Sequence, residues 1–239
     1  MAVFQGTGKQ KVWLVPDCRT QARPPALDPG PGFPNLALMR PTFLLLLLTL
    51  TAAAPCQDKP ALELLLMLPE PRVLRTERSL VPEGAQSTVL SPAREIAEVP
   101  GIEVYPKEDF IRLGLSPETF AARAGKAADR LLTVLKPDLV KDAEGRVIYA
   151  VYRGGRPVMA CLLLAPSLNA LFETLLGERL WAAVPDRHSF YLFPAKPGVL
   201  EEFTADLAAR YREDPHAASP EVFELVKGAP PRVIGAFAR

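Results

Sequence analysis

The stretch from Leu162 to Pro194 constrains the fold more than any other part of the sequence, because nearly all its apolar residues are spaced for burial. It begins with a continuous apolar run. Apolar residues then recur at the i, i+3, i+4, i+7, i+8 spacing of an amphipathic helix; they are Leu168, Leu171, Phe172, Leu175 and Leu176. Gly177 can close this helix. Two apolar segments follow, Leu180–Val184 and Ser189–Phe193, and they predict a β-hairpin with a charged tip at Pro185–His188.

Further elements are expected before this stretch. Ser116-Pro117-Glu118 combines a capping residue, a proline suited to the first turn and an acid that favours the helix dipole, so a helix is expected from there to Pro137. Arg146–Tyr152 is rich in β-forming residues, and Val158–Leu164 is wholly apolar. Because Gly154-Gly155 between them suits a tight turn, a first hairpin is predicted.

The C-terminal part predicts two helices and a strand. A third main helix is expected at about 198–212, with Leu200, Phe203, Leu207 and Tyr211 facing inward and the charged residues Glu202, Asp206 and Arg210 forming a solvated face. Ser219-Pro220-Glu221 predicts a short helix, and Arg232–Phe237 a last strand. The fold class that follows is α+β: an antiparallel sheet of two hairpins plus edge strands, packed with three main helices, over residues 110–239.

The predicted strands are apolar on both faces, so both faces of the sheet need cover. Within the chain, the helix from Ser116 and the Pro-rich segment before Phe110 can supply it. A second subunit or another protein is the alternative. Burial of Trp181 and Tyr191 in the monomer would indicate internal cover.

Residues 55–109 are interpreted as a Pro-rich linker that wraps the domain, with one short strand near Ile102–Tyr105. Six prolines punctuate the segment after residue 68. Ala61–Leu68 is apolar, but its length does not distinguish a strand from a short helix.

The N-terminal 54 residues predict export. Residues 1–38 are Pro-rich and have no sustained apolar period, so they are interpreted as a mis-called or disordered leader. Residues 39–54 place a positive charge, an apolar run and small residues in the order of a secretory signal peptide. Cleavage is expected after Ala53 or Ala54, and lipidation of Cys56 is the alternative mode of export. The expected location is the periplasm, the cell envelope or the medium.

Charge and cysteine content narrow the expected partners. The whole chain carries a net charge of +1, and residues 1–54 hold five basic and two acidic residues, so the remainder is close to −2. No nucleic-acid partner is therefore expected, and membrane attachment is expected only through the signal peptide or Cys56. A protein partner remains open, and no cofactor is expected. Cys161 lies in an apolar segment and is interpreted as a small core residue.

The best candidate site is the predicted hairpin tip, with Asp186, Arg187 and His188, joined by His216 of the Asp214-Pro215-His216 turn. An imidazole beside a carboxylate can act as a base or a ligand. Each of these residues is equally at home in an ordinary turn. Because the chain has two histidines and no metal-ligand spacing, no metal site is predicted.

Several segments between residues 110 and 227 resemble the bacterial YtpQ-like domains of unknown function. They include Leu-Gly-Glu-Arg-Leu-Trp-Ala-Ala-Val-Pro-Asp-Arg at 176–187, Tyr-Leu-Phe-Pro at 191–194 and Asp-Pro-His at 214–216. His188 stands where the family pattern has an acidic residue. The resemblance implies no reaction and no catalytic residues. Two functions are therefore carried forward: an exported non-catalytic envelope protein or binding module, and, as the alternative, a hydrolase-type enzyme that uses Asp186, His188 and His216.

Overall fold

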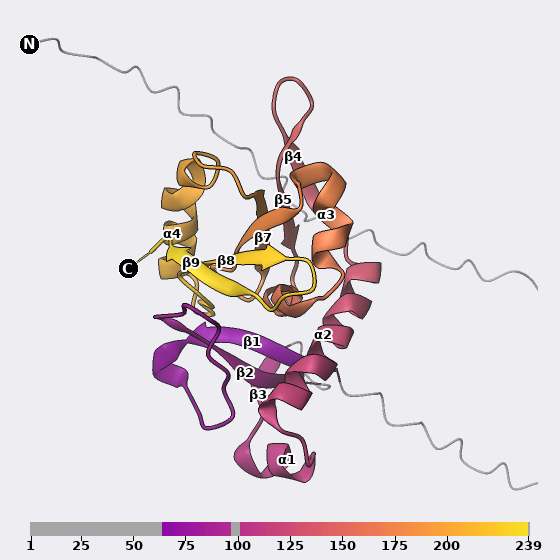
Figure 1. The fold of residues 1–239 in the computed structure, drawn as a ribbon. Helices are drawn as coiled ribbons and strands as arrows, with labels where there is room; N and C mark the ends of the chain where they lie inside the picture. Colours follow the sequence, from indigo (N-terminus) through magenta and orange to yellow (C-terminus); the bar gives the residue numbers. More distant parts are fainter. Residues whose placement is uncertain (1–63, 97–100, 239) are drawn as a thin grey trace, which may run out of the picture. The chain divides into compact units, whose positions relative to one another are not determined.

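A computed structural model describes residues 64–96 and 101–238, all within one compact unit, Pro55–Arg239. The predicted leader, signal peptide, cleavage region and Cys56 lie outside these ranges. Helices combine with two antiparallel sheets, one of six strands and one of three, so the predicted α+β class is confirmed (Figure 1). No helix in the described ranges is long and apolar enough to cross a membrane.

The six-stranded sheet forms the centre of the described fold. From one edge to the other, its strands are β4 (Asp138–Lys141), β5 (Val147–Arg153), β7 (Ser189–Pro194), β6 (Arg179–Ala183), β8 (Glu221–Val226) and β9 (Arg232–Ala236). The predicted β6–β7 hairpin is present, with Ala182 opposite Leu192. The expected C-terminal strand is β9, which pairs with β8.

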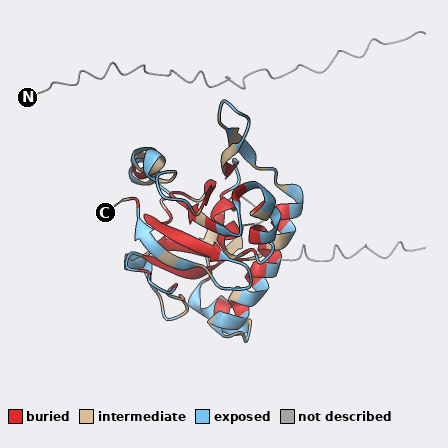
Figure 2. Ribbon diagram, turned by 45° about the horizontal axis from the view of Figure 1, so that its top comes forward, coloured by how far each residue is buried: buried red, intermediate tan, exposed pale blue. Residues whose placement is uncertain are grey.

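Alternating side chains of the central strands enter two different apolar clusters. In β7, Phe190 and Leu192 belong to the larger cluster, whereas Tyr191 and Phe193 belong to the smaller one. The larger cluster is completed by helices α2 (Pro117–Val134) and α3 (Leu168–Leu176) and by the 3₁₀ helix η2 (Met159–Leu164). The smaller cluster is completed by α4 (Thr204–Glu213) and the 3₁₀ helix η3 (Glu201–Phe203). Figure 2 shows the central strands buried and the outer faces of the helices exposed.

The three main helices form close to where their sequence signals predict. Ser116 caps α2, since its hydroxyl accepts a hydrogen bond from the backbone N–H of Thr119 at 3.2 Å. Gly177 ends α3 with a φ of 100°, which a residue with a Cβ adopts only under strain. Helix α4 follows η3, and Leu207 and Ala208 are its buried residues.

The interpretation of residues 64–109 as a linker is wrong. They contain β1 (Leu65–Pro71), η1 (Arg72–Leu74), β2 (Thr88–Glu95), the correctly predicted short strand β3 (Ile102–Val104) and α1 (Lys107–Arg112). Leu66, Leu68 and Leu90 belong to the same large apolar cluster as the central sheet. This region therefore helps to cover one face of the central sheet, as expected, but it does so as strands of the core and not as a linker.

The prolines wrongly suggested a linker. Those within β1 and β2 are compatible with strands, because their missing N–H groups remove few hydrogen bonds between the strands. Pro69 pairs with Leu90, whose N–H and C=O are both bonded to Leu80 instead of β1. Pro92 lies in the middle strand, β2. Its C=O accepts from the N–H of Tyr105 on the β3 side, so its nitrogen points to that side as well. The β2–β3 ladder ends at Ala93, so the nitrogen of Pro92 lies beyond it. A proline whose nitrogen points away from a ladder is compatible with a strand.

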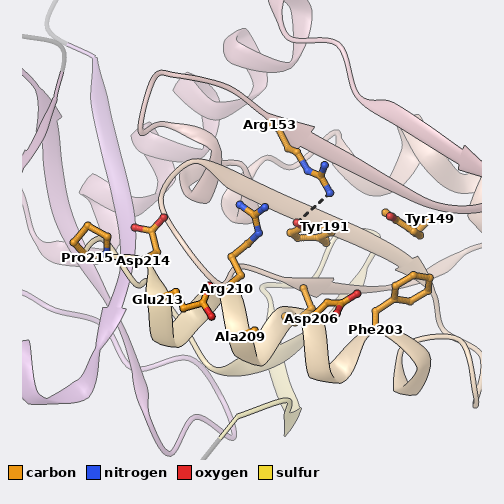
Figure 3. Close-up of a pocket in the computed structure, with 11 residues that line it drawn as sticks. Tyr149, Arg153, Tyr191, Phe203, Asp206, Ala209, Arg210, Glu213, Asp214 and Pro215 are labelled. Atoms are coloured by element: carbon orange, nitrogen blue, oxygen red, sulfur yellow. Dashed lines mark hydrogen bonds between the residues drawn. The ribbon is translucent and has the colours of Figure 1, made fainter. Parts of the chain in front are cut away.

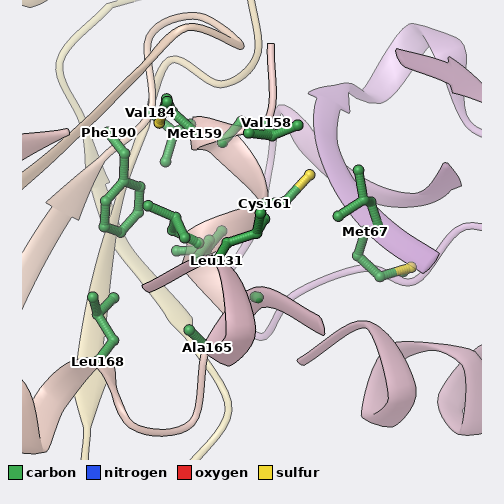
Figure 4. Close-up of a cluster of buried hydrophobic side chains, with 14 of the residues drawn as sticks. Met67, Leu131, Val158, Met159, Cys161, Ala165, Leu168, Val184 and Phe190 are labelled. Atoms are coloured by element: carbon green, nitrogen blue, oxygen red, sulfur yellow. The ribbon is translucent and has the colours of Figure 1, made fainter. Parts of the chain in front are cut away.

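The prediction of a strand at 158–164, and of a first hairpin built on it, is also wrong. Most of this apolar run forms η2, which is buried against β1, α2 and β7 (Figure 4). The partners of β5 are instead β4 and β7. A run that is apolar at every position is buried on all sides in either conformation, so its pattern does not identify a strand.

The short helix predicted from Ser219 is instead strand β8, whose first five residues are all buried. The Ser-Pro-Glu sequence has a different role here. The Ser219 hydroxyl lies 2.6 Å from that of Thr88, and one carboxylate oxygen of Glu221 accepts from the backbone N–H groups of Gln86 and Ser87. These bonds attach the β1–β2 connection to the central sheet.

Cover of both sheet faces comes from within the chain. Tyr191 is buried and Trp181 is half-buried. On their face the covering helix is α4, whereas the Ser116 helix, α2, packs on the opposite side with β1 and η2.

Candidate functional site

The predicted site residues at the β6–β7 turn form a buried junction. Asp186 is 0% exposed, and its carboxylate accepts from the His188 backbone N–H at 2.7 Å and from the Ser189 hydroxyl at 2.6 Å. Arg210 of α4 approaches the same carboxylate at 3.4 Å. These donors hold Asp186 in place as the acceptor that shapes the turn.

Arg187 is also committed to the fold. Its guanidinium donates to Glu70 of β1 at 2.9 Å, which connects the turn to the three-stranded sheet. Burial raises the pKa of the Glu70 carboxyl above its usual range, although the charge of Arg187 and hydrogen bonds from Ser91 and Arg187 oppose the shift. The ion pair between Arg187 and Glu70 therefore offsets only part of the cost of burying the Glu70 carboxylate.

The structure brings His188 and His216 together, with ring centroids 6.1 Å apart. The backbones of their two turns are joined, because Arg187 N–H donates to the His216 carbonyl at 3.2 Å and Ala218 N–H donates to the Pro185 carbonyl at 2.9 Å. Each carboxylate near them accepts a backbone N–H: Asp186 from His188, and Asp214 from His216. Within the described ranges, no carboxylate is hydrogen-bonded to either imidazole ring.

A pocket of about 560 Å³ lies beside this junction, between α4 and the β5–β7 part of the sheet (Figure 3). We call it the α4 pocket. It is lined by Tyr149, Arg153, Tyr191, Phe203, Asp206, Leu207, Ala209, Arg210, Glu213, Asp214 and Pro215. Its sheet side presents Tyr149, Tyr191 and Arg153, and its helix side presents Phe203 and the other charged residues.

Arg153, the last residue of β5, is held over the aromatic floor of the pocket. Its guanidinium donates to the Tyr191 hydroxyl at 3.2 Å and lies 5.4 Å from the centre of the Tyr191 ring. Within the described ranges, no carboxylate forms an ion pair with it. Arg153 therefore brings to the pocket a positive charge that is not used in an ion pair, together with unused N–H donors.

Arg210 reaches the same space from the opposite wall. It projects from α4, and in Figure 3 its guanidinium and that of Arg153 extend toward the Tyr191 ring from the two sides of the pocket. Its one ion pair among the described residues is the long contact with Asp186. Most of its donors are therefore available as well.

The aromatic wall is ordered by ring contacts. The rings of Tyr149 and Phe203 meet edge-to-face, with centroids 4.8 Å apart, and Tyr149 also lies 6.3 Å from Tyr191. Burial raises the pKa of the Tyr149 hydroxyl. The charge of Arg153 opposes this shift, and the charges of Tyr191 and Asp206 add to it. Tyr149 therefore stays protonated and offers a hydroxyl donor at neutral pH.

The residues that define this pocket were not predicted from the sequence. Asp206 and Arg210 were expected on a solvated helix face, and no role was expected for Arg153 or Tyr149. One signal was present: β5 ends in a single arginine after an aromatic and apolar run, so a charge is carried to the end of a buried strand. The sequence does not indicate that α4 packs on that end.

A second pocket, of about 350 Å³, lies where α2, α3 and the turn after β8 meet, and it is mainly apolar. Ala121, Leu168, Val226 and Pro230 are among its lining residues. Unlike the α4 pocket, it contains no charged side chain.

No family model, curated protein or solved structure matches the chain. The resemblance to the YtpQ-like domains therefore remains a hypothesis, and the geometry of the site is what indicates a function.

Proposed function

We propose that this chain is a non-catalytic binding module that holds a small ligand with an aromatic body and one anionic group in the α4 pocket. The observation that carries the proposal is the convergence of Arg153 and Arg210 on the Tyr191 ring with most of their N–H donors unused. Arginine binds carboxylates through paired N–H donors, and the hydrogen bond is stronger because both groups are charged.

The other walls limit the size and charge of the ligand. Tyr149, Tyr191 and Phe203 provide aromatic surface for a flat apolar body. Asp206, Glu213 and Asp214 place three acidic residues along the α4 side. They outnumber the two arginines and would repel a polyanion, so the ligand is expected to carry a single anionic group, placed where the guanidinium groups of Arg153 and Arg210 approach each other.

The hydrolase alternative is less well supported. It requires an imidazole activated by a carboxylate, and the proximity of His188 and His216 is the one observation in its favour. Asp186 instead accepts from a backbone N–H, the Ser189 hydroxyl and Arg210. An Asp186 carboxylate held in this way orders the turn and does not orient a ring.

We further propose that the protein is exported, on the basis of the signal-peptide pattern at residues 39–54. N-terminal sequencing of the protein from cell fractions tests this proposal. A chain that begins near residue 54 and is recovered from the envelope or the medium is expected. A cytoplasmic chain that keeps Met1 would contradict it.

Calorimetric titration with benzoate and phenylacetate, compared with neutral benzyl alcohol and the polyanion citrate, tests the binding proposal. Both aromatic carboxylates should bind more tightly than either comparison compound. Arg153→Gln and Arg210→Gln should each weaken benzoate binding by about tenfold, the effect of roughly one charge-assisted hydrogen bond. Arg123→Gln is the matched control, because it makes the same charge change on the exposed surface of α2.

Two results would contradict the proposal. One is the absence of benzoate binding to the wild-type protein at millimolar concentration. The other is equal benzoate affinity in the wild type and in the double variant of Arg153 and Arg210.

A further inference from the structure

The geometry points to a second site, separate from the α4 pocket: we propose that His188 and His216 together bind one late first-row divalent transition-metal ion, such as zinc or nickel. The inference does not depend on the proposed ligand of the pocket. It follows from the distance between the rings, the hydrogen bond of one ring and the way the two turns are fixed.

The distance between the rings is close to that of two imidazoles on one metal ion. Metal–nitrogen bonds are about 2.0–2.1 Å long, so the ring centres lie about 6.5 Å apart when the imidazoles bind on opposite sides of the ion and about 5 Å apart in a tetrahedral site, which a rotation of one ring can reach. The His188 and His216 centroids are separated by 6.1 Å, with 52° between the ring planes. His216 is exposed, and its ring has no hydrogen-bond partner in the described part of the chain. It can therefore rotate to complete the coordination without breaking a bond.

The hydrogen bond of His188 leaves the correct nitrogen available. Nδ1 lies 3.2 Å from the carbonyl oxygen of Gly154. A carbonyl oxygen only accepts, so Nδ1 carries the proton and Nε2 of the neutral ring keeps its lone pair. Metal-binding histidines characteristically donate their second nitrogen to a backbone carbonyl or a carboxylate, which orients the ring.

The two turns that carry the histidines are held rigidly with respect to each other. Asp186 accepts from His188 N–H and Asp214 accepts from His216 N–H, each at 2.7 Å. The backbones are then bridged, because Asp186 pairs with Ala217 in an isolated antiparallel bridge. The backbone of both turns is therefore already ordered, and binding one ion costs mainly the rotational freedom of the His216 ring.

The chemistry of the donors decides the class of metal. Within residues 64–96 and 101–238, no group of three or more His, Cys, Asp or Glu side chains is placed to hold a metal. The protein would thus supply two imidazole nitrogens, and water would complete the coordination. Neutral imidazole suits zinc, copper and nickel, whereas magnesium and calcium prefer oxygen ligands. The nearby guanidinium of Arg187 is paired with Glu70, which limits its repulsion of the cation.

Titration of the metal-free full chain with zinc chloride and with nickel chloride tests the proposal, and magnesium chloride is the control. One zinc or nickel ion should bind per chain, and magnesium should not bind. His216→Gln should lower the zinc affinity at least tenfold; because His216 is exposed, this variant should fold normally, and a thermal melt checks this. Arg153→Gln should leave zinc binding unchanged, which separates this site from the α4 pocket.

Unchanged zinc affinity in the double variant of His188 and His216 would overturn the proposal and assign the zinc to other ligands, such as the thiols of Cys18 or Cys56. Absence of zinc and nickel binding to the wild-type chain would also overturn it. Selective broadening of the His188 and His216 ring resonances by nickel would support the site directly.

Discussion

The two faces of the central sheet are covered to different depths. On one face, α2, α3, η2 and the three-stranded sheet enclose a large apolar cluster that includes Phe190, Leu192 and Phe223. On the other, α4 and η3 cover a smaller cluster around Tyr191 and Phe193, and a pocket remains between the helix and the sheet. The same strands therefore stabilise the fold on one side and carry the candidate ligand site on the other.

Buried carboxylates on the two faces of the sheet also differ in the direction of their pKa shifts. Glu70, on the thickly covered side, has a raised pKa because burial outweighs its single arginine partner. Glu224 lies on the α4 side of β8, opposite Trp181. Burial would raise its pKa, but hydrogen bonds and charge from Arg179 and Arg232 outweigh that and hold the pKa below its usual range. The ionised carboxylate is thus stabilised at Glu224, on the α4 face, and destabilised at Glu70, on the opposite face.

The largest difference between the faces should appear when one leucine is truncated on each. Leu192→Ala removes a side chain that is 0% exposed in the large cluster, and Leu207→Ala removes one that is 2% exposed on α4. We expect the free energy of unfolding to fall by about 4 kcal/mol in Leu192→Ala and by about 2 kcal/mol in Leu207→Ala. The second loss is smaller because α4 can move to fill part of the cavity that the truncation leaves.

Urea unfolding at pH 7 measures both losses. The chemistry of the two substitutions is identical, so Leu207→Ala is the matched comparison for Leu192→Ala. Equal losses would show that the two faces contribute equally to stability.

A smaller effect is expected from the two aspartates that shape the turns. Asp186→Ala leaves the His188 N–H, the Ser189 hydroxyl and Arg210 without their acceptor in a buried site, which should cost about 2–3 kcal/mol. Asp214→Ala removes a hydrogen bond of the same 2.7 Å length from an exposed turn and should cost about 1 kcal/mol or less, because water can replace it. Thermal unfolding of both variants measures the difference, and a reversed order would contradict the buried role of Asp186.

The sequence predicts those parts of the fold in which local signals and tertiary packing agree. The Ser116 cap, Gly177 and the alternating β6–β7 hairpin all coincide with the structure. The run at 158–164 and the Ser219-Pro220-Glu221 segment do not, because each sequence is compatible with more than one backbone conformation. Tertiary contacts select between these conformations: burial on every side for η2, and a place between β6 and β9 for β8.

The site is harder to predict for a related reason. The sequence places Asp186, His188 and His216 in turns, but it does not predict that the rings of His188 and His216 lie 6.1 Å apart, as they do in the structure. The α4 pocket joins residues from β5, β7 and α4, and a helical pattern shows which face is apolar without showing which strands it covers. Only the tertiary fold therefore shows that Arg153 and Arg210 line the same pocket.

The smallest stability effect in this comparison concerns pH. The depressed pKa of Glu224 means that its contribution is present above the unfolded pKa, about 4.3, and is lost as the pH falls through the lower folded pKa. Wild type should exceed Glu224→Gln by about 1 kcal/mol at pH 7, since the arginine partners are largely exposed. This advantage should disappear once the pH is below the folded pKa.

Glu70→Gln should show the opposite slope. Its folded pKa is raised, so the ionised carboxylate destabilises the fold above that pKa. The stability of the wild type relative to Glu70→Gln should therefore increase as the pH falls from 7 toward 4. Urea unfolding at several pH values measures both slopes, and slopes of the same sign would contradict the contrast between the two faces.

Chemical-shift mapping with benzoate tests the central claim most directly, because it shows which face of the sheet carries the ligand site. Amide shifts should be confined to α4, the end of β5 near Arg153, and β7 around Tyr191, and they should be lost in the double variant of Arg153 and Arg210. Shifts centred instead on Leu168, Val226 and Pro230 of the apolar second pocket would contradict the assignment of the ligand site to the α4 face.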